Sequence, residues 1–120
     1  MPTEPLLPGY YYHIYNRGNN RENLFKEERN YIFFLKKFKH YMSELVEVHA
    51  YCLMPNHFHF LIEIKVTANS KAVSQAFRLL FMSYTKAINK ATGRVGSLFQ
   101  HQFHRKLVDS DAYYLSLIHI

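Results

Sequence analysis

The chain has 120 residues, enough for one domain with its own hydrophobic core. Fifteen Lys and Arg residues against nine Asp and Glu residues give a net charge of +6. That balance favours a polyanionic partner such as nucleic acid, although a basic domain without one is an equal alternative. The single cysteine excludes an internal disulfide, and no apolar run approaches the roughly 20 residues of a membrane span. The N-terminus lacks the features of a signal peptide, so we expect a cytoplasmic, nucleoid-associated protein.

Residues 1–9 hold three of the four prolines and predict an extended lead-in to a domain over residues 10–120. The aromatic, β-prone run 10–15 predicts a first strand, and the polar residues 16–21 predict a turn. Glu27 and Glu28 open a helix whose apolar residues recur every three or four positions as far as Leu45.

Residues 46–53 and 57–64 predict two antiparallel strands joined by a turn at Met54-Pro55-Asn56. Side chains alternate along a strand, so each strand presents two different faces. In the first of these strands we expect one face to carry Val48, Ala50 and Cys52, and the other to carry Glu47, His49 and Tyr51.

A long amphipathic helix is predicted over residues 71–90, ended by a glycine stop at Gly93. Residues 97–108 predict a fourth strand or extended segment. Asp109-Ser110-Asp111 is a helix N-cap signal, and a last helix is expected from Ala112, with no stop signal before the sequence ends.

The resulting order, β-α-β-β-α-β and a final helix, predicts an α+β, ferredoxin-like split βαβ fold. We expect an antiparallel sheet with both long helices on one face. The apolar side of strand 57–64 should face those helices, which leaves His57 and His59 on the open face.

His57 and His59 stand two residues apart, so their backbones are about 7 Å apart along a strand. Two imidazoles on a basic sheet suit Mg²⁺ or Mn²⁺, with at least one further ligand required. The spacing and the lack of thiols argue against structural zinc. Such an ion favours phosphodiester chemistry, for which a tyrosine is a possible nucleophile.

Several stretches resemble the IS200-like (Y1) transposases of the HUH nuclease superfamily, in particular the branch associated with repetitive extragenic palindromes. The central stretch is VHAYCLMPNHFHFL at 48–61. The others are YHIYNRGNN at 12–20, GSLFQ at 96–100 and VDSD at 108–111.

The resemblance implies a homodimeric, metal-dependent enzyme that cleaves and rejoins single-stranded DNA next to hairpins. His57 and His59 would be the metal ligands. A tyrosine on the last helix would attack the phosphate and form a 5′-phosphotyrosine, and an Asn or Gln one turn later would supply the third ligand.

The sequence departs from this pattern at the last helix. The family's tyrosine aligns with Ile120, so we expect a C-terminally truncated domain or a decayed, catalytically incomplete copy. Tyr113 and Tyr114 are substitute nucleophile candidates, and packing of the helix is the simpler explanation of both. His13 and His49 are expected near the histidine pair, more simply as structural residues.

Basic residues in or beside the loops and the fourth strand are candidate DNA-phosphate contacts, with plain solvation an equal alternative. They are Arg17, Arg21, Arg94, Arg105 and Lys106. Two other functions stay open: a DNA-hairpin-binding dimer without cleavage activity, and a ferredoxin-like RNA-binding module with incidental histidines.

Overall fold

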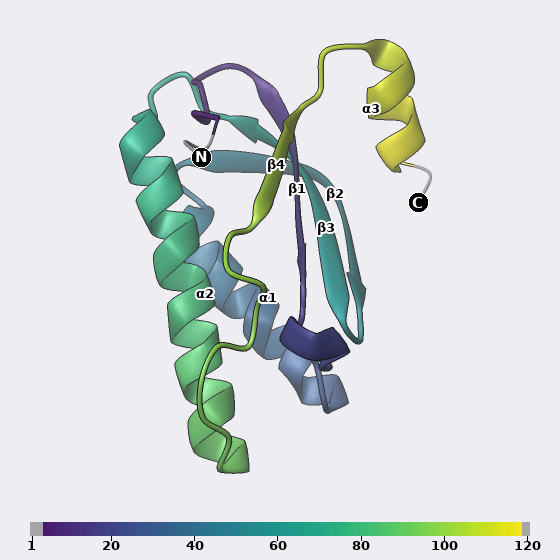
Figure 1. Cartoon of the computed structure of the whole chain (residues 1–120). Helices are drawn as coiled ribbons and strands as arrows, with labels where there is room; N and C mark the ends of the chain where they lie inside the picture. The colour runs from purple at the N-terminus through teal and green to yellow at the C-terminus, as the bar shows by residue number, and fades with distance from the viewer. Residues whose placement is uncertain (1–3, 119–120) are drawn as a thin grey trace.

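The computed structural model describes residues 4–118 and confirms the α+β architecture (Figure 1). A four-stranded antiparallel sheet has the order β2-β3-β1-β4, the arrangement expected of a split βαβ fold. The elements in chain order are β1 Tyr11–Arg17, the short helix η1 Asn19–Arg21, α1 Glu28–Met42, β2 Val46–Met54, β3 His57–Ile64, α2 Ser70–Thr92, β4 His104–Leu107 and α3 Asp111–Ile118.

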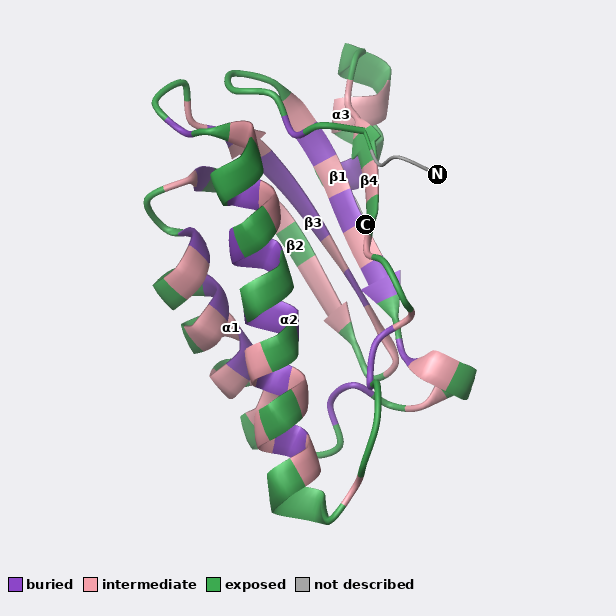
Figure 2. Cartoon of the chain, turned by 60° about the vertical axis from the view of Figure 1, so that its left-hand side comes forward, coloured by how far each residue is buried: buried purple, intermediate pink, exposed green. Residues whose placement is uncertain are grey.

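Helices α1 and α2 cover one face of the sheet, as predicted, and their buried sides face the buried side of β3 (Figure 2). Phe38 of α1 stacks on Phe60 of β3 with ring centroids 4.4 Å apart. The Asn69 side chain caps the start of α2, and Gly93 ends it in the left-handed conformation, with φ of 70°. This packing fixes β3, and therefore the histidine pair, in the centre of the sheet.

The predicted alternation along β2 is wrong after Val48. Val48 pairs with Ile62 of β3, whereas Ala50 pairs with Leu61, so His49 is one extra residue in the strand. Such a β-bulge reverses the faces of the residues that follow it. The residues whose faces are exchanged are Ala50 and Cys52, now on the open face, and Tyr51, now on the helix face.

The fourth strand is shorter than the predicted segment 97–108, because only His104–Leu107 pairs with β1. The residues before it form no strand, and Phe99 and Phe103 among them pack against Phe81 of α2. An isolated bridge between Gly18 and Phe99 and a hydrogen bond from Gln100 N to Arg17 O hold this connection beside the end of β1.

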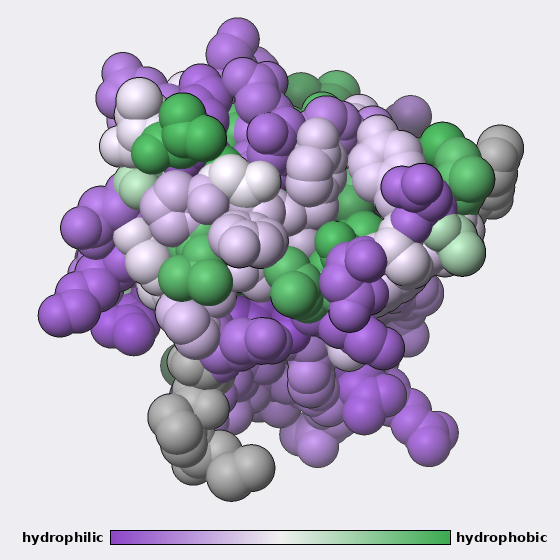
Figure 3. Space-filling view, turned by 90° about the horizontal axis from the view of Figure 1, so that it is seen from above, coloured by the Kyte–Doolittle hydropathy of each residue, from purple (hydrophilic) through white to green (hydrophobic). Residues whose placement is uncertain are grey.

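The face opposite α1 and α2 is not fully open, because α3 packs against β2 and β3 there. Leu117 is the buried residue of α3 and lines a small cavity with Ala50, Cys52 and Leu61. Seen from above, the surface is largely hydrophilic, with hydrophobic residues in separate small patches (Figure 3). Within residues 4–118, no helix combines the length and hydrophobicity needed to span a membrane.

Candidate functional site

The histidine pair lies in the middle of the sheet on the face away from α1 and α2. In β1, the neighbouring strand, Arg17 pairs with His57 and Tyr15 pairs with His59. The two imidazole rings are 5.2 Å apart between centroids and nearly perpendicular, at 84°. The alternation of β3 therefore brings both rings to one place, while Phe58 between them is buried in the core.

The turn that precedes β3 orients His57. Asn56 Oδ1 lies 2.9 Å from His57 Nδ1. Because an amide oxygen only accepts hydrogen bonds, Nδ1 carries the proton and donates. In the neutral ring, the lone pair is then on Nε2, which is the arrangement commonly found for a histidine that binds a metal ion.

His59 belongs to a hydrogen-bonded chain that reaches α3. Its Nδ1 lies 2.8 Å from His13 Nε2, and His13 Nδ1 lies 2.9 Å from the Tyr113 hydroxyl. His13 and His59 also stack, with ring centroids 5.1 Å apart. Three residues from β1, β3 and α3, which are separated in the sequence, therefore form one polar chain.

Burial and neighbouring positive groups keep these two imidazoles neutral. Burial, with added repulsion from His59 and Lys106, lowers the pKa of His13 to about 4. Burial and the nearby His57 also lower the pKa of His59. Near neutral pH, both rings are thus uncharged and able to offer a lone pair.

The neutral chain has two possible hydrogen-bond directions. In one, His59 Nδ1–H donates to His13, His13 Nδ1–H donates to the Tyr113 oxygen, and the lone pair of His59 lies on Nε2. In the other, the Tyr113 hydroxyl donates to His13, and His59 Nε2 carries a proton. Only the first direction leaves His59 Nε2 free to bind a cation, so the state of Tyr113 is linked to that of His59.

Both candidate tyrosines of α3 contact histidines. Burial, with the nearby Tyr15 and Asp109, raises the pKa of Tyr113, so its phenol stays protonated near neutral pH. Tyr114 lies farther along the sheet, with its hydroxyl 3.5 Å from His49 Nδ1 and its ring at an edge to Tyr11. Of the two, only Tyr113 joins the chain that includes His59.

The position aligned with the family's tyrosine, Ile120, lies outside the described residues. The structure therefore gives no view of that position. The expectation of a catalytically incomplete site stays a prediction.

The donor set fits part of a divalent metal site. His57 and His59 present their imidazoles on one face, each with Nδ1 in a hydrogen bond. Across residues 4–118, no three His, Cys, Asp or Glu side chains gather closely enough to hold an ion. Any third ligand within that range would be an amide, a hydroxyl or water, which hard divalent ions accept.

A row of aromatic rings extends the site across the sheet. His104 of β4 stacks on Tyr15 of β1 at 4.9 Å, and Tyr15 stacks on His59 at 5.8 Å, both between ring centroids. Rings in this arrangement offer surfaces on which unpaired bases can stack.

The five predicted phosphate contacts lie in different surroundings. Arg17 at the end of β1 and Arg21 at the end of η1 are exposed. The Lys106 ammonium lies 5.3 Å from the centroid of the Tyr113 ring. Arg94 binds both carboxylate oxygens of Glu22. Arg105 points to the helix side of the sheet, since it pairs with Ile14. Contact of any of these side chains with DNA stays a prediction.

Sequence reasoning placed His13 near the histidine pair and did not single out Asn56 as a site residue. One signal was available for His13, because it alternates with Tyr11 and Tyr15 on a strand expected beside the histidine pair. The hydrogen bonds of His13 to His59 and Tyr113 depend on the register between β1 and β3 and on the position of α3, and neither follows from the sequence.

Comparisons with known proteins identify the family of the chain. The model of the family described as "Transposase IS200 like" matches residues 7–116. A REP-associated tyrosine transposase bound to a REP hairpin has a similar structure, with a TM-score of 0.75 at 15% identity, over 98% of this chain and 67% of that one.

A protein of Deinococcus radiodurans R1, provisionally assigned as a transposase, has a TM-score of 0.57 at 16% identity, over 97% of this chain and 92% of that one. No curated protein matches the chain. Identities this low establish similarity of fold alone, whereas the family model covers most of the sequence. The chain therefore belongs to the IS200-like transposase family.

Proposed function

We propose that this chain binds DNA hairpins and acts on the adjoining single strand with a divalent metal ion, Mg²⁺ or Mn²⁺. His57 and His59 would hold the ion through Nε2. The observation that carries the proposal is the chain of hydrogen bonds from Tyr113 through His13 to His59, which connects a possible nucleophile to a possible metal ligand.

In the proposed reaction, the Tyr113 oxygen attacks the scissile phosphorus. A bond forms between phosphorus and the phenol oxygen while the bond to the 3′ oxygen of the neighbouring nucleotide breaks. The products are a 5′-phosphotyrosine and a free 3′-hydroxyl. The phenol proton passes to water, since His13 donates to the Tyr113 oxygen when His59 Nε2 is free, and the leaving 3′ oxygen takes a proton from water.

Activation of the phenol is the main requirement, because the pKa of Tyr113 is raised. A bound divalent ion would polarise the phosphate and offset the developing negative charge. His13 would keep the phenol oriented towards the site. Tyr15 and His104 would stack unpaired bases beside it.

The test is covalent capture of a hairpin oligonucleotide with single-stranded flanks and a labelled 3′ end. We expect an adduct that requires Mg²⁺ or Mn²⁺, persists in Tyr114→Phe and disappears in Tyr113→Phe. Replacing both His57 and His59 with alanine should also abolish it. An adduct that persists in Tyr113→Phe would refute the role of Tyr113.

The second candidate is a hairpin-binding protein without cleavage activity. It is favoured because no three His, Cys, Asp or Glu side chains in the described part of the chain are arranged to hold an ion, and because the pKa of Tyr113 is raised. Hairpin binding without any adduct, unchanged in Tyr113→Phe and Tyr114→Phe, would support it. Metal-independent binding that prefers RNA would instead favour an RNA-binding module.

We also propose a homodimer. The edge strand β2 exposes Val48, Tyr51 and Met54, which are suited to contact with another protein surface. Sedimentation equilibrium would test this proposal, and a monomer across the concentrations used for DNA binding would refute it.

A further inference from the structure

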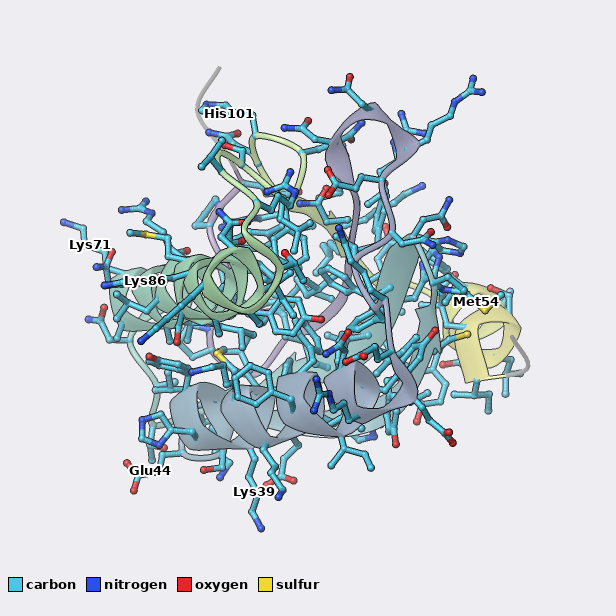
Figure 4. All side chains as sticks on the ribbon, turned by 90° about the horizontal axis from the view of Figure 1, so that it is seen from below. Lys39, Glu44, Met54, Lys71, Lys86 and His101 are labelled. Atoms are coloured by element: carbon cyan, nitrogen blue, oxygen red, sulfur yellow. The ribbon has the colours of Figure 1, made fainter. Side chains whose placement is uncertain are left out.

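A second concave surface lies away from the histidine pair. A groove of about 810 Å³ runs between α2 and the segment 96–105 that leads into β4. Its volume is in the range of ordinary ligand sites. In Figure 4, Lys86 of α2 and His101 of the connecting segment lie on this side of the molecule, whereas Lys39 projects from α1.

The groove is lined by positive charge. Arg78 and Lys86 come from α2 and Arg105 comes from β4. Among the described residues, no Asp or Glu lines the groove. A surface with three permanent cations and no carboxylate attracts a polyanion.

The groove also has an apolar component suited to flat bases. Met82 is 61% exposed on the α2 side, and Phe103 lines the opposite side. The Arg105 guanidinium carbon lies 4.3 Å from the centroid of the Phe103 ring. A planar cation on an aromatic ring and an exposed thioether in the same groove are surfaces on which unpaired bases can stack.

Internal hydrogen bonds hold the groove in shape. Asn89 Nδ2 donates to Gly96 O at 3.0 Å, and Asn16 Nδ2 donates to Gln100 O at 3.2 Å. Arg105 is fixed by a hydrogen bond from Nη1 to Ser74 Oγ at 3.0 Å. Because these contacts exist without a ligand, binding there would cost little ordering entropy.

From these observations we infer that the groove binds the unpaired DNA strand that flanks a hairpin. This inference rests on the proposed function. Arg78 and Lys86 are eight residues apart on α2, which corresponds to about 12 Å along the helix axis. A stacked strand advances about 3.4 Å per nucleotide, so the two cations would contact phosphates roughly three or four nucleotides apart.

The edge strand β4 connects this groove to the histidine face. Arg105 of this strand points to the helix side of the sheet. Its neighbours His104 and Lys106 point to the opposite side, since they pair with Tyr15 and His13 of β1. A strand leaving the groove therefore needs only to pass around this single four-residue edge strand to reach the proposed metal ligands.

The experiment compares two double variants with equal loss of charge. Arg78→Gln with Lys86→Gln removes two groove cations, and Lys36→Gln with Lys39→Gln removes two cations from α1. The probes are a fluorescent hairpin with an oligothymidine flank and the same hairpin with blunt ends. Affinity is measured by anisotropy at several salt concentrations, and circular dichroism checks the fold of each variant.

Each phosphate contact on a single strand contributes about 0.7 to the slope of log affinity against log salt concentration. Over the tenfold range from about 1 M to 0.1 M salt, this slope corresponds to a gain of about fivefold in affinity per contact. We expect the groove variant to lose about 25-fold on the flanked hairpin, with a slope smaller by about 1.4. The α1 variant should lose under threefold.

Equal losses for the two double variants would overturn the inference, and so would an equal loss for the flanked and blunt hairpins. Either result leaves the proposed function in place, provided that the wild-type protein binds the hairpin. If the wild-type protein binds neither probe, both the groove assignment and the proposed function fail.

Discussion

Arg94 connects the end of α2 to the segment that forms one wall of the groove. Its guanidinium binds both carboxylate oxygens of Glu22 and donates to the carbonyl oxygens of Gly96 and Ser97. The hydrogen bonds from Arg94 are the main reason that the pKa of Glu22 is lowered from 4.5 to about 2. Replacing Arg94 with methionine keeps the aliphatic stem and removes all of these bonds.

The pKa of Glu22 gives the size of the expected loss of stability and the direction in which that loss changes with pH. A decrease from 4.5 to about 2 corresponds to at most about 3 kcal/mol. The side chains of Arg94 and Glu22 are 16% and 29% exposed, so we expect solvent screening to reduce this to about 1–2 kcal/mol. Because the folded-state pKa is the lower one, this stability is fully present above pH 4.5 and is lost as the pH falls from 4.5 towards 2.

The assay is urea unfolding of the wild type and Arg94→Met between pH 7 and pH 2.5. We expect the variant to be less stable by about 1–2 kcal/mol at pH 7, with the difference shrinking at acid pH. Arg29→Met is the control, since its ion pair with Glu27 is exposed and should contribute under 0.5 kcal/mol. A loss at Arg94 no larger than at Arg29, or one independent of pH, would refute the reasoning.

Three further predictions concern single positions. His13→Gln should weaken Mn²⁺ binding about 10- to 100-fold by calorimetry, because it changes the partner that orients His59; unchanged affinity would contradict the metal assignment. Tyr84→Phe should cost about 1–2 kcal/mol in urea unfolding, since its buried hydroxyl donates to Leu24 O at 2.7 Å; a neutral effect would contradict that bond. Gly93→Ala should lower the free energy of unfolding by about 1 kcal/mol because its φ is 70°, and greater stability would contradict that strain.

The sequence was sufficient for most of the fold because hydrophobic periodicity records which side of each element is buried. The stripes of both long helices, the turn before His57 and the glycine stop at Gly93 follow local rules, and the structure agrees with them. The predicted alternation of side chains along β2 was wrong after Val48. The bulge at His49 depends on how β2 pairs with β3, and a short sequence pattern does not indicate it.

The limits of the fourth strand were also set by tertiary contacts. Residues 97–103 have a composition compatible with a strand, but Phe99 and Phe103 pack against Phe81 of α2. Arg94 binds the carbonyl oxygen of Ser97, and Asn89 binds that of Gly96 just before it. The groove beside α2 could not be predicted from the sequence, because its walls come from segments that only the tertiary structure brings together.

By itself, the sequence determined the fold class, the family resemblance and the common face of His57 and His59, because a strand's two-residue repeat is a local property. Only the tertiary structure decided what surrounds that pair. His13, Tyr113 and Asn56 meet the pair through strand register, the packing of α3 and a turn conformation. Contacts between segments far apart in the chain depend on the whole packed core, and local patterns do not encode them.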